Sequence, residues 1–321
     1  MAPKAVVTGG AGFIGSHLIE RLLADGYETL AVDNFDTFYS GKESNISHLF
    51  ENTNFKLVRG DILDYQCVSR AFEKADFVFH LAAQPGVSFS LENPAKTHLI
   101  NTTGTLNVLM AAAKMKPRRF IYASSSSVYG AATTTPVSET HPTSPLSIYG
   151  ISKLAAEQYC LNFFRLRNLP VVALRYHTVF GPRQRPDMAI FKWSEAILSG
   201  RSPLIYGDGT QSRDFTYVED IVNGTMLAAE CENANGQVFN LATGKPVTIS
   251  YALETIERAL GKKAIHVDHE PTKPYDPPFT HADISKAKNN LNYRPEVDFE
   301  KGIRNFATWM LKRASSRVAT T

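Results

Sequence analysis

A glycine-rich turn near the amino terminus is the feature that most constrains this chain of 321 residues. The apolar run Ala5–Thr8 leads into three spaced glycines, Gly9, Gly12 and Gly15, and helical spacing follows over Ile14–Ala24. Such glycines permit a tight turn, close approach of the backbone to a pyrophosphate, and close packing of helix on strand. The helix start would offer free N–H groups to the same phosphates. A glycine triad alone is often a plain turn, but strand, turn and helix in this order predict a dinucleotide site.

Strands and helices alternate through the first 175 residues. Short β-branched and aromatic runs are separated by segments with helical spacing, which is the pattern of a parallel sheet covered on both faces. The sequence therefore predicts an α/β fold built on a Rossmann-type doubly wound parallel sheet. The predicted strands are Ala5–Thr8, Thr29–Val32, Phe55–Arg59, Phe77–Leu81, Phe120–Ala123 and Val171–Arg175. The predicted helices are Ile14–Ala24, Val68–Glu73, Gly104–Lys114 and Tyr149–Leu166.

The regular alternation weakens after Arg175, where Gly, Pro and Asp become frequent. We therefore expect a dinucleotide-binding domain over residues 1–175 that also carries the catalytic side chains. Residues 176–321 are expected to form mainly a smaller α/β lobe that binds the substrate and is interleaved with the first domain. This division agrees with a usual domain size of about 100–200 residues.

Composition and charge exclude several classes of protein. The net charge is +3, from 34 basic and 31 acidic residues without a long block of one sign, so we expect no nucleic-acid partner. No apolar run approaches the roughly 20 residues of a membrane-spanning helix, and the first residues do not resemble a signal peptide. The isolated cysteines Cys67, Cys160 and Cys231 fit a reducing compartment better than a disulfide framework or a zinc site. These features predict a cytoplasmic protein with no membrane partner and no metal.

The second predicted strand is followed by an acidic residue, Asp33, and then by Asn34. A carboxylate at this position accepts hydrogen bonds from the hydroxyls of an adenosine ribose. Its charge would repel a 2′-phosphate, and no Arg follows it, so NAD is favoured over NADP. Asp61 and Ile62, after the third strand, are placed to meet the adenine. The alternative is that Asp33 only caps a turn at the end of its strand.

Two polar patterns indicate proton transfer. Tyr149 and Lys153 lie one helical turn apart and hence on one helix face. A nearby ammonium would lower the phenol pKa, which makes Tyr149 a plausible general base for a sugar hydroxyl during hydride transfer. The fifth strand ends in a run of serines, 124–127, at the sheet edge where ligands of open α/β sheets bind. Taken singly, these patterns are more often an ordinary helix surface and a serine-rich turn.

In combination, these residues resemble the extended short-chain dehydrogenase/reductase family and, within it, the nucleotide-sugar 4-epimerases. The resemblance covers essentially the whole chain. The segments that carry it are 8–15, 33–34, 60–62, 81–84, Asn101, 124–130, 149–153, 175–176, 181–183, 207–209, 213–216 and 220–221.

The resemblance implies a role for each matching position. Ser125 would bind the sugar O4 and share its proton with Tyr149, and Lys153 would complete the catalytic group. Arg213 would pair with the UDP pyrophosphate and Asp276 would bind the uridine ribose, while Lys273 stands where relatives often carry an Arg or Gln. A homodimer packing helices near 103–114 and 149–166 is also implied. The residues that would hold NAD are Gly9, Gly12, Phe13, Ile14, Gly15, Asp33, Asn34, Asp61, Ile62, Leu81, Ala82, Ala83, Gln84, Asn101, Ser124, Tyr149, Lys153 and Tyr176.

The residues after Ser125 indicate the type of reaction. Related dehydratases carry an Asp-Glu pair there to remove a C5 proton and expel water, and related UDP-glucuronate decarboxylases keep a Glu. This chain has Ser126 and Ser127, which cannot act as acid or base near neutral pH. We therefore expect the 4-keto sugar to be reduced again after it turns its other face. The product would be the C4 epimer, and NAD would be regenerated in each turnover.

The run 178–189 indicates the sugar. UDP-glucose 4-epimerases usually have Asn at the position of Thr178 and lack an Arg like Arg185, whereas the UDP-glucuronate 4-epimerases resemble this run. The resemblance implies that the C6 carboxylate is surrounded by Ser126, Ser127, Thr178 and Arg185. Arg is the natural partner of a planar carboxylate. The competing interpretation is a surface salt bridge of Arg185 on a Pro-flanked loop. The expected reaction is UDP-glucuronate to UDP-galacturonate.

Other functions stay open at this point. The nearest alternative is a UDP-glucose or UDP-N-acetylglucosamine 4-epimerase. A net NAD-dependent oxidoreductase or decarboxylase is a remoter alternative, and so is a non-catalytic dinucleotide-binding protein.

Overall fold

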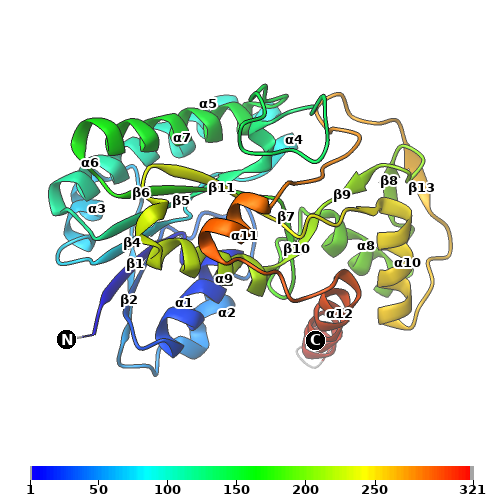
Figure 1. Cartoon of the computed structure of the whole chain (residues 1–321). Helices are drawn as coiled ribbons and strands as arrows, with labels where there is room; N and C mark the ends of the chain where they lie inside the picture. Colours follow the sequence, from blue (N-terminus) through cyan, green and yellow to red (C-terminus); the bar gives the residue numbers. More distant parts are fainter. Residues whose placement is uncertain (1, 319–321) are drawn as a thin grey trace.

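A seven-stranded sheet forms the centre of the protein, as the computed structural model of residues 2–318 shows (Figure 1). The strand order is β11-β6-β5-β4-β1-β2-β3, and every neighbouring pair is parallel. The predicted α/β class with a doubly wound parallel sheet is therefore confirmed. The strands are β1 Lys4–Thr8, β2 Glu28–Asp33, β3 Phe55–Arg59, β4 Phe77–His80, β5 Arg119–Ser125, β6 Val171–Tyr176 and β11 Gln237–Leu241.

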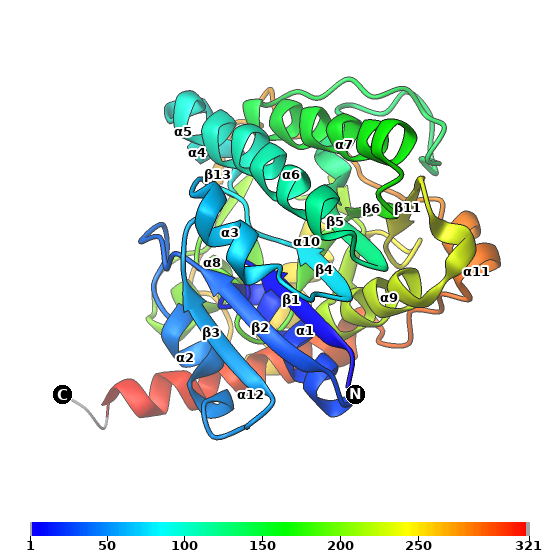
Figure 2. The same ribbon diagram turned by 90° about the vertical axis from the view of Figure 1, so that its left-hand side faces the viewer.

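Helices cover both faces of this sheet (Figure 2). The alternation of side chains along a strand sends Val6 into the core on one face and Ala5 and Val7 into the core on the other. Helices α3 Tyr65–Ala71, α6 Thr105–Met115 and α7 Ile148–Arg167 contribute to the core that contains Val6. Helices α1 Phe13–Ala24 and α9 Val218–Glu230 contribute to the core that contains Ala5.

The predicted elements are all present, with ends shifted by a few residues at most. The seventh strand, β11, was missed, and it lies beyond residue 175 in the part assigned to the second lobe. It pairs with β6 from Gln237 opposite Val172 to Leu241 opposite Tyr176. The sheet thus contains chain from both sides of the predicted domain boundary, and the boundary itself stays a prediction.

Beyond the sheet, small two-stranded pairs and helices form the remaining part, on the right in Figure 1. The pairs are β7 Thr178–Phe180 with β10 Phe215–Tyr217, β8 Leu204–Tyr206 with β13 Asp268–Glu270, and β9 Ser212–Arg213 with β12 Val247–Thr248. The helices there are α8 Ala189–Leu198, α10 Ile249–Leu260 and α12 Phe299–Val318, while α11 Ser285–Leu291 lies against β11 and α9. Three short helices, α2 Lys42–Ile46, α4 Val87–Glu92 and α5 Pro94–His98, follow β2 and β4.

The carboxyl ends of the parallel strands meet at one edge of the sheet. The chain order reverses between β1 and β4, which is where open α/β sheets bind ligands. The turn after β1 and the segment after β4 therefore lie side by side, and Ser125 at the end of β5 pairs in register with Tyr176 at the end of β6. None of the helices within residues 2–318 combines the length and apolar character needed to span a membrane.

Candidate active site

Two adjoining cavities open at the carboxyl edge of the sheet. The larger has a volume of about 420 Å³ and the smaller about 270 Å³, and both are lined by Ser126, Ser127 and Thr178. An elongated ligand can therefore run from one cavity into the other past these three residues. The residues of the predicted cofactor set that line the larger cavity are Gly9, Gly12, Phe13, Ile14, Gly15, Asp33, Asn34, Asp61, Ile62, Leu81, Ala82, Ala83, Gln84, Ser124, Tyr149, Lys153 and Tyr176.

The glycine-rich turn packs so closely against other backbone atoms that residues with a Cβ do not fit at two of its positions. Gly9 has a φ of +71°, and a Cβ there would lie 2.7 Å from the backbone nitrogen of Ala82. A Cβ on Gly15 would lie 2.2 Å from the carbonyl oxygen of Gly9. Gly12 at the start of α1 makes no side-chain cap, so this helix end presents backbone N–H groups, of which that of Phe13 meets Tyr39. This turn fits the pyrophosphate of a dinucleotide.

Asp33 is fixed at the end of β2 by backbone N–H groups. Its Oδ2 accepts a hydrogen bond from Ala11 N at 3.1 Å, and its Oδ1 accepts one from Phe35 N at 2.8 Å. Burial raises the pKa of Asp33, and the nearby Lys42 ammonium and these N–H groups oppose the rise. Nζ of Lys42, the first residue of α2, lies 3.9 Å from Oδ1 of Asp33. The sequence analysis missed Lys42 because a single Lys forms no motif.

Asn101 lies behind the larger cavity and does not line it. Its Oδ1 accepts a hydrogen bond from Gln84 N at 2.7 Å, and its Nδ2 donates to Gln84 O at 3.0 Å and to Ser152 Oγ at 2.9 Å. These bonds hold the segment after β4 against α7. Asn101 therefore supports Gln84, which lines the cavity, and its own contact with NAD stays a prediction.

The start of α7 presents Tyr149 to Ser125. Ser147 caps this helix, accepting a hydrogen bond from Gly150 N at 3.0 Å, and Tyr149 N donates to Ser90 Oγ at 3.0 Å. Tyr149 and Ser125 both line the larger cavity. Burial raises the pKa of Tyr149, while Arg185 and the side chain of Ser125 act in the opposite direction. A phenol and an alcohol that line one cavity are suited to act together on the proton of a bound hydroxyl group.

Lys153 lines the larger cavity together with Tyr149, and its effect on the phenol of Tyr149 stays a prediction. Its ammonium lies over the ring of Tyr122, with Nζ at 4.5 Å from the ring centre, and burial lowers its pKa to about 8. The guanidinium of Arg185 lowers the pKa of Tyr149. The spacing of one helical turn places Tyr149 and Lys153 on one face of α7, as predicted. The ammonium of Lys153 points toward the ring of Tyr122.

A buried ion pair supports the end of β5. Glu157, one turn beyond Lys153, accepts hydrogen bonds from Arg175 Nη2 at 2.6 Å, from Arg175 Nε at 3.0 Å and from Ser124 Oγ at 2.6 Å. Both charged side chains are almost fully enclosed, so each carboxylate oxygen needs these partners. The Ser124 hydroxyl is thus engaged with Glu157, which fixes the strand end that carries Ser125.

Arg185 lines the larger cavity and forms a two-pronged ion pair with Asp187. Its Nε and Nη2 donate to Oδ1 and Oδ2 of Asp187, both at 2.9 Å. The salt bridge considered as an alternative therefore exists, but its Arg side chain is only 21% exposed and faces the cavity. Among the described residues, Nη1 of Arg185 has no hydrogen-bond partner and is available to a ligand. Asp187 also lines this cavity; its place in the run 178–189 was the signal that sequence reasoning left unused.

The smaller cavity contains the two residues assigned to the UDP part. Arg213 Nη2 lies 2.6 Å from Oδ1 of Asp276, so these two side chains form an ion pair with each other. Lys273 lies over the ring of Tyr206 at 4.6 Å and 3.5 Å from Glu270. Aromatic rings, a guanidinium and a carboxylate together are suited to a base, a phosphate and a ribose. Further residues lining one of the two cavities and not foreseen are Asp36, Phe38, Tyr39, Pro85, Gly86, Val87, His177, Val179, Met188, Ser88, Leu146, Ser147, Tyr275, Pro277 and Thr280.

Comparison with known proteins agrees with this geometry. The family profile described as GDP-mannose 4,6 dehydratase matches residues 6–306. UDP-glucuronate 4-epimerase of Thermodesulfobacterium geofontis is 38% identical over 309 residues, which are 95% of this chain and 95% of that protein. UDP-glucuronate 4-epimerase 4 of Arabidopsis thaliana is 36% identical over 97% of this chain and 77% of that protein.

Solved structures give the same result. UDP-glucuronic acid 4-epimerase from Bacillus cereus, in complex with UDP-glucuronic acid and NAD, superimposes with a TM-score of 0.91 and 38% identity, covering 97% of this chain and 99% of that one. UDP-N-acetylglucosamine 4-epimerase from Methanobrevibacter ruminantium has a TM-score of 0.90 and 35% identity over 98% and 100% of the two chains. The resemblance predicted from the motifs is confirmed, and this chain belongs to the GDP-mannose 4,6 dehydratase family, within the extended short-chain dehydrogenases/reductases.

Proposed function

We propose that this protein is an NAD-dependent UDP-sugar 4-epimerase that interconverts UDP-glucuronate and UDP-galacturonate. The observation that carries the choice of sugar is Arg185, which lines the larger cavity together with Tyr149, Ser126, Ser127 and Thr178. A guanidinium beside three hydroxyl groups suits a planar carboxylate. The relatives named for UDP-glucuronate epimerisation support the proposal, while the N-acetylglucosamine epimerase among the solved structures keeps a neutral sugar as the alternative.

The chain's own residues account for the proton transfer. Ser125 would hold O4 of the sugar, and Tyr149, which lines the same cavity, would take the O4 proton. NAD, held by the residues of the larger cavity, would supply a reversible acceptor for the C4 hydride. Because Ser126 and Ser127 cannot remove the C5 proton, the 4-keto sugar has no route to dehydration. Its rotation within the cavity, followed by reduction, gives the epimer.

The proposal is tested by offering the purified protein UDP-glucuronate, UDP-glucose and UDP-N-acetylglucosamine without added cofactor, and by separating the products. We expect UDP-galacturonate from UDP-glucuronate, with no accumulation of NADH. Conversion of only a neutral sugar would move the assignment to the alternative epimerases. Stoichiometric NADH would indicate a net oxidoreductase, and no product at all would favour a binding protein.

The protein as purified should contain NAD and not NADP, because the fixed carboxylate of Asp33 would repel a 2′-phosphate. Denaturing the protein and identifying the released nucleotide by mass checks this. In Asp33→Asn the ammonium of Lys42 loses its charged partner, so added NADP should compete with NAD better than it does in the unmodified protein. NADP in the extract of the unmodified protein would overturn the argument from Asp33.

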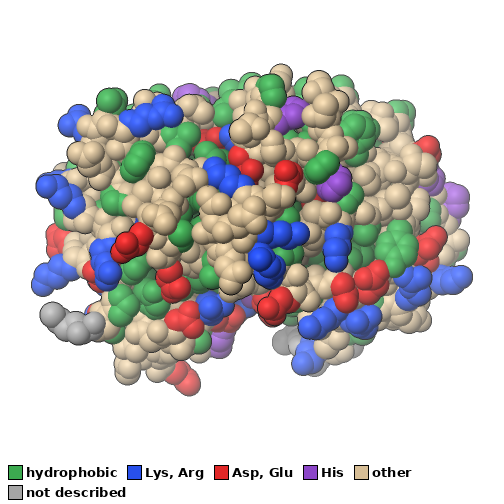
Figure 3. Space-filling model, viewed as in Figure 1, with side chains coloured by type: hydrophobic (Ala, Val, Ile, Leu, Met, Phe, Trp, Pro, Cys, Tyr) green, Lys and Arg blue, Asp and Glu red, His purple; other side chains and the backbone are tan. Residues whose placement is uncertain are grey.

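We further propose that the protein is a cytoplasmic homodimer. Support for a second copy comes from apolar side chains exposed on the neighbouring helices α6 and α7, namely Met110, Ile151, Tyr159 and Leu166. Three free cysteines support a reducing compartment. On the face shown in Figure 3, basic and acidic side chains are interspersed rather than gathered by sign.

A further inference from the structure

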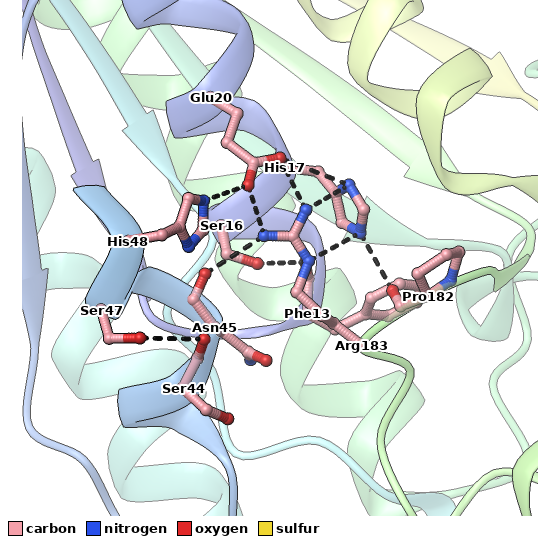
Figure 4. A network of polar contacts seen from close by, with 10 residues as sticks. All are labelled: Phe13, Ser16, His17, Glu20, Ser44, Asn45, Ser47, His48, Pro182 and Arg183. Atoms are coloured by element: carbon pink, nitrogen blue, oxygen red, sulfur yellow. Dashed lines mark hydrogen bonds and ion pairs between the residues drawn. The ribbon is translucent and has the colours of Figure 1, made fainter. Parts of the chain in front are cut away.

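A polar cluster outside both cavities joins the cofactor turn to the segment that carries Arg185. Figure 4 shows the guanidinium of Arg183 between Glu20, His17 and Asn45, and these four residues are called the Arg183 clasp. Nη1 donates to Glu20 Oε1 at 2.8 Å and to Asn45 O at 3.1 Å, and Nη2 donates to Glu20 Oε2 at 2.6 Å. This two-pronged geometry fixes both the direction and the distance of the guanidinium.

The backbone at Arg183 is shaped to make these contacts. Arg183 has a φ of +66°, in the left-handed region that a side chain with a Cβ rarely adopts. Gly181, just before it, has a φ of +144°, and a Cβ there would lie 2.7 Å from Val218. A strained residue outside the reacting site persists only where its surroundings hold it. Here the clasp holds it.

His17 closes the clasp as a neutral ring. Burial and the charge of Arg183 lower its pKa to about 4. Both ring nitrogens face Arg183: His17 Nδ1 lies 2.8 Å from Nη2, and His17 Nε2 accepts from Arg183 Nε at 3.2 Å and lies 2.9 Å from Pro182 O. The ring of His17 thereby connects helix α1 to the backbone oxygen of Pro182 and to the side chain of Arg183.

The two ends of the clasp reach the two parts of the site. On one side, Asn45 Nδ2 donates to Ala11 O of the glycine-rich turn at 3.0 Å, and Lys42 of the same helix α2 lies beside Asp33. On the other side, Arg185 follows Arg183 by two residues and lines the cavity. A shift of Arg183 would therefore move Arg185 relative to the cofactor turn.

We propose that Arg183 is a positioning residue for the sugar: its ion pair with Glu20 sets where Arg185 stands with respect to the bound cofactor. The inference rests on the proposed function, in which Arg185 binds the sugar carboxylate. It predicts that Arg183 acts on ligands that carry this carboxylate and has little effect on UDP, which ends in the smaller cavity. A purely structural role would weaken all ligands alike.

The test measures binding by calorimetry to the NAD-loaded protein in a Tyr149→Phe background, so that no ligand is turned over. Arg183→Ala should weaken binding of UDP-glucuronate by about 10- to 100-fold, the usual effect of misplacing a contact by about 1 Å. Binding of UDP should change by no more than about twofold, the worth of an exposed contact. Glu20→Ala should give the same pattern, and the double variant should lose no more than either single variant.

The matched control is Arg21→Ala. Arg21 lies on the same helix and forms an exposed ion pair with Asp25 at 2.7 Å, away from the clasp. The melting temperature and NAD content of each variant establish that it is folded. If Arg183→Ala does not fold, Glu20→Ala carries the test alone.

Two results would overturn the inference: a loss in Arg183→Ala or Glu20→Ala no larger than in Arg21→Ala, or equal losses for UDP and UDP-glucuronate. The proposed function is examined separately by Arg185→Ala in the same assay. If Arg185→Ala weakens UDP-glucuronate and Arg183→Ala does not, the clasp inference fails and the carboxylate contact stands. If Arg185→Ala has no effect, the carboxylate contact itself fails.

Discussion

Replacing Tyr149 by Phe should leave a folded, NAD-loaded protein whose turnover of UDP-glucuronate is lower by about 10²–10⁴, the usual worth of a general base. The substitution removes only the hydroxyl of Tyr149 and keeps the ring that lines the cavity. The proton from O4 then has no acceptor, because Ser125 alone cannot hold a negative charge near neutral pH. The rate of product formation at saturating UDP-sugar measures the loss.

The matched control is Tyr65→Phe, the same substitution at the start of helix α3, where the residue is 37% exposed and lines neither cavity. We expect this variant to turn over at the rate of the unmodified protein. Released NAD should be equal in both variants and the unmodified protein, which separates a chemical defect from loss of cofactor. Near-normal turnover in Tyr149→Phe would remove Tyr149 from its role.

Local patterns in the sequence were sufficient for the cofactor half of the site. The close approaches at Gly9 and Gly15 are to backbone atoms, and the carboxylate of Asp33 accepts hydrogen bonds from backbone N–H groups. Spacing along the chain therefore predicts the positions of these residues. Their place on the sheet then follows from the register of parallel strands, which put Ser125 beside Tyr176. These predictions needed no knowledge of how distant side chains pack.

The remaining features depend on contacts between distant parts of the chain. The sequence near β11 does not indicate that this strand pairs with β6, because any short apolar strand can extend the open edge of a sheet. The ion pair of Glu157 with Arg175 links α7 to β6. The turn of Lys153 toward Tyr122 is likewise decided by packing under the sheet edge. The pairing of Arg185 with Asp187 is local, but spacing alone does not tell whether an Arg faces solvent or a cavity.

Arg185→Ala should reduce transition-state binding for UDP-glucuronate by about 2–4 kcal/mol, if the carboxylate of the sugar is then left poorly paired. This corresponds to a fall in kcat/KM of about 30- to 1000-fold. Loss of the guanidinium also leaves Asp187, a second carboxylate, facing the same cavity without its partner. Repulsion between the two carboxylates adds to the lost attraction. Neutral sugars such as UDP-glucose lack this carboxylate, so their kcat/KM should change far less.

The same variant should release more CO₂. Oxidising glucuronate at C4 makes a β-keto acid, which loses CO₂ as the carboxylate charge flows into the ring carbonyl. Hydrogen bonds from Ser126, Ser127 and Thr178, with a charge-assisted bond from Arg185, keep that charge on the carboxylate and hold the C5–C6 bond out of line with the carbonyl π-system. Without Arg185 this restraint weakens, so the ratio of decarboxylated product to UDP-galacturonate should rise.

The control for this variant is Arg201→Ala, which removes an Arg whose side chain is 67% exposed and lies 3.9 Å from Glu195. Both variants are assayed with UDP-glucuronate and UDP-glucose, and products are separated after matched extents of reaction. Equal losses on the charged and the neutral sugar, or no loss on UDP-glucuronate, would move the assignment to an epimerase of neutral sugars. A selective loss on UDP-glucuronate would place its carboxylate at Arg185, because only a group on the sugar that carries charge distinguishes the two substrates.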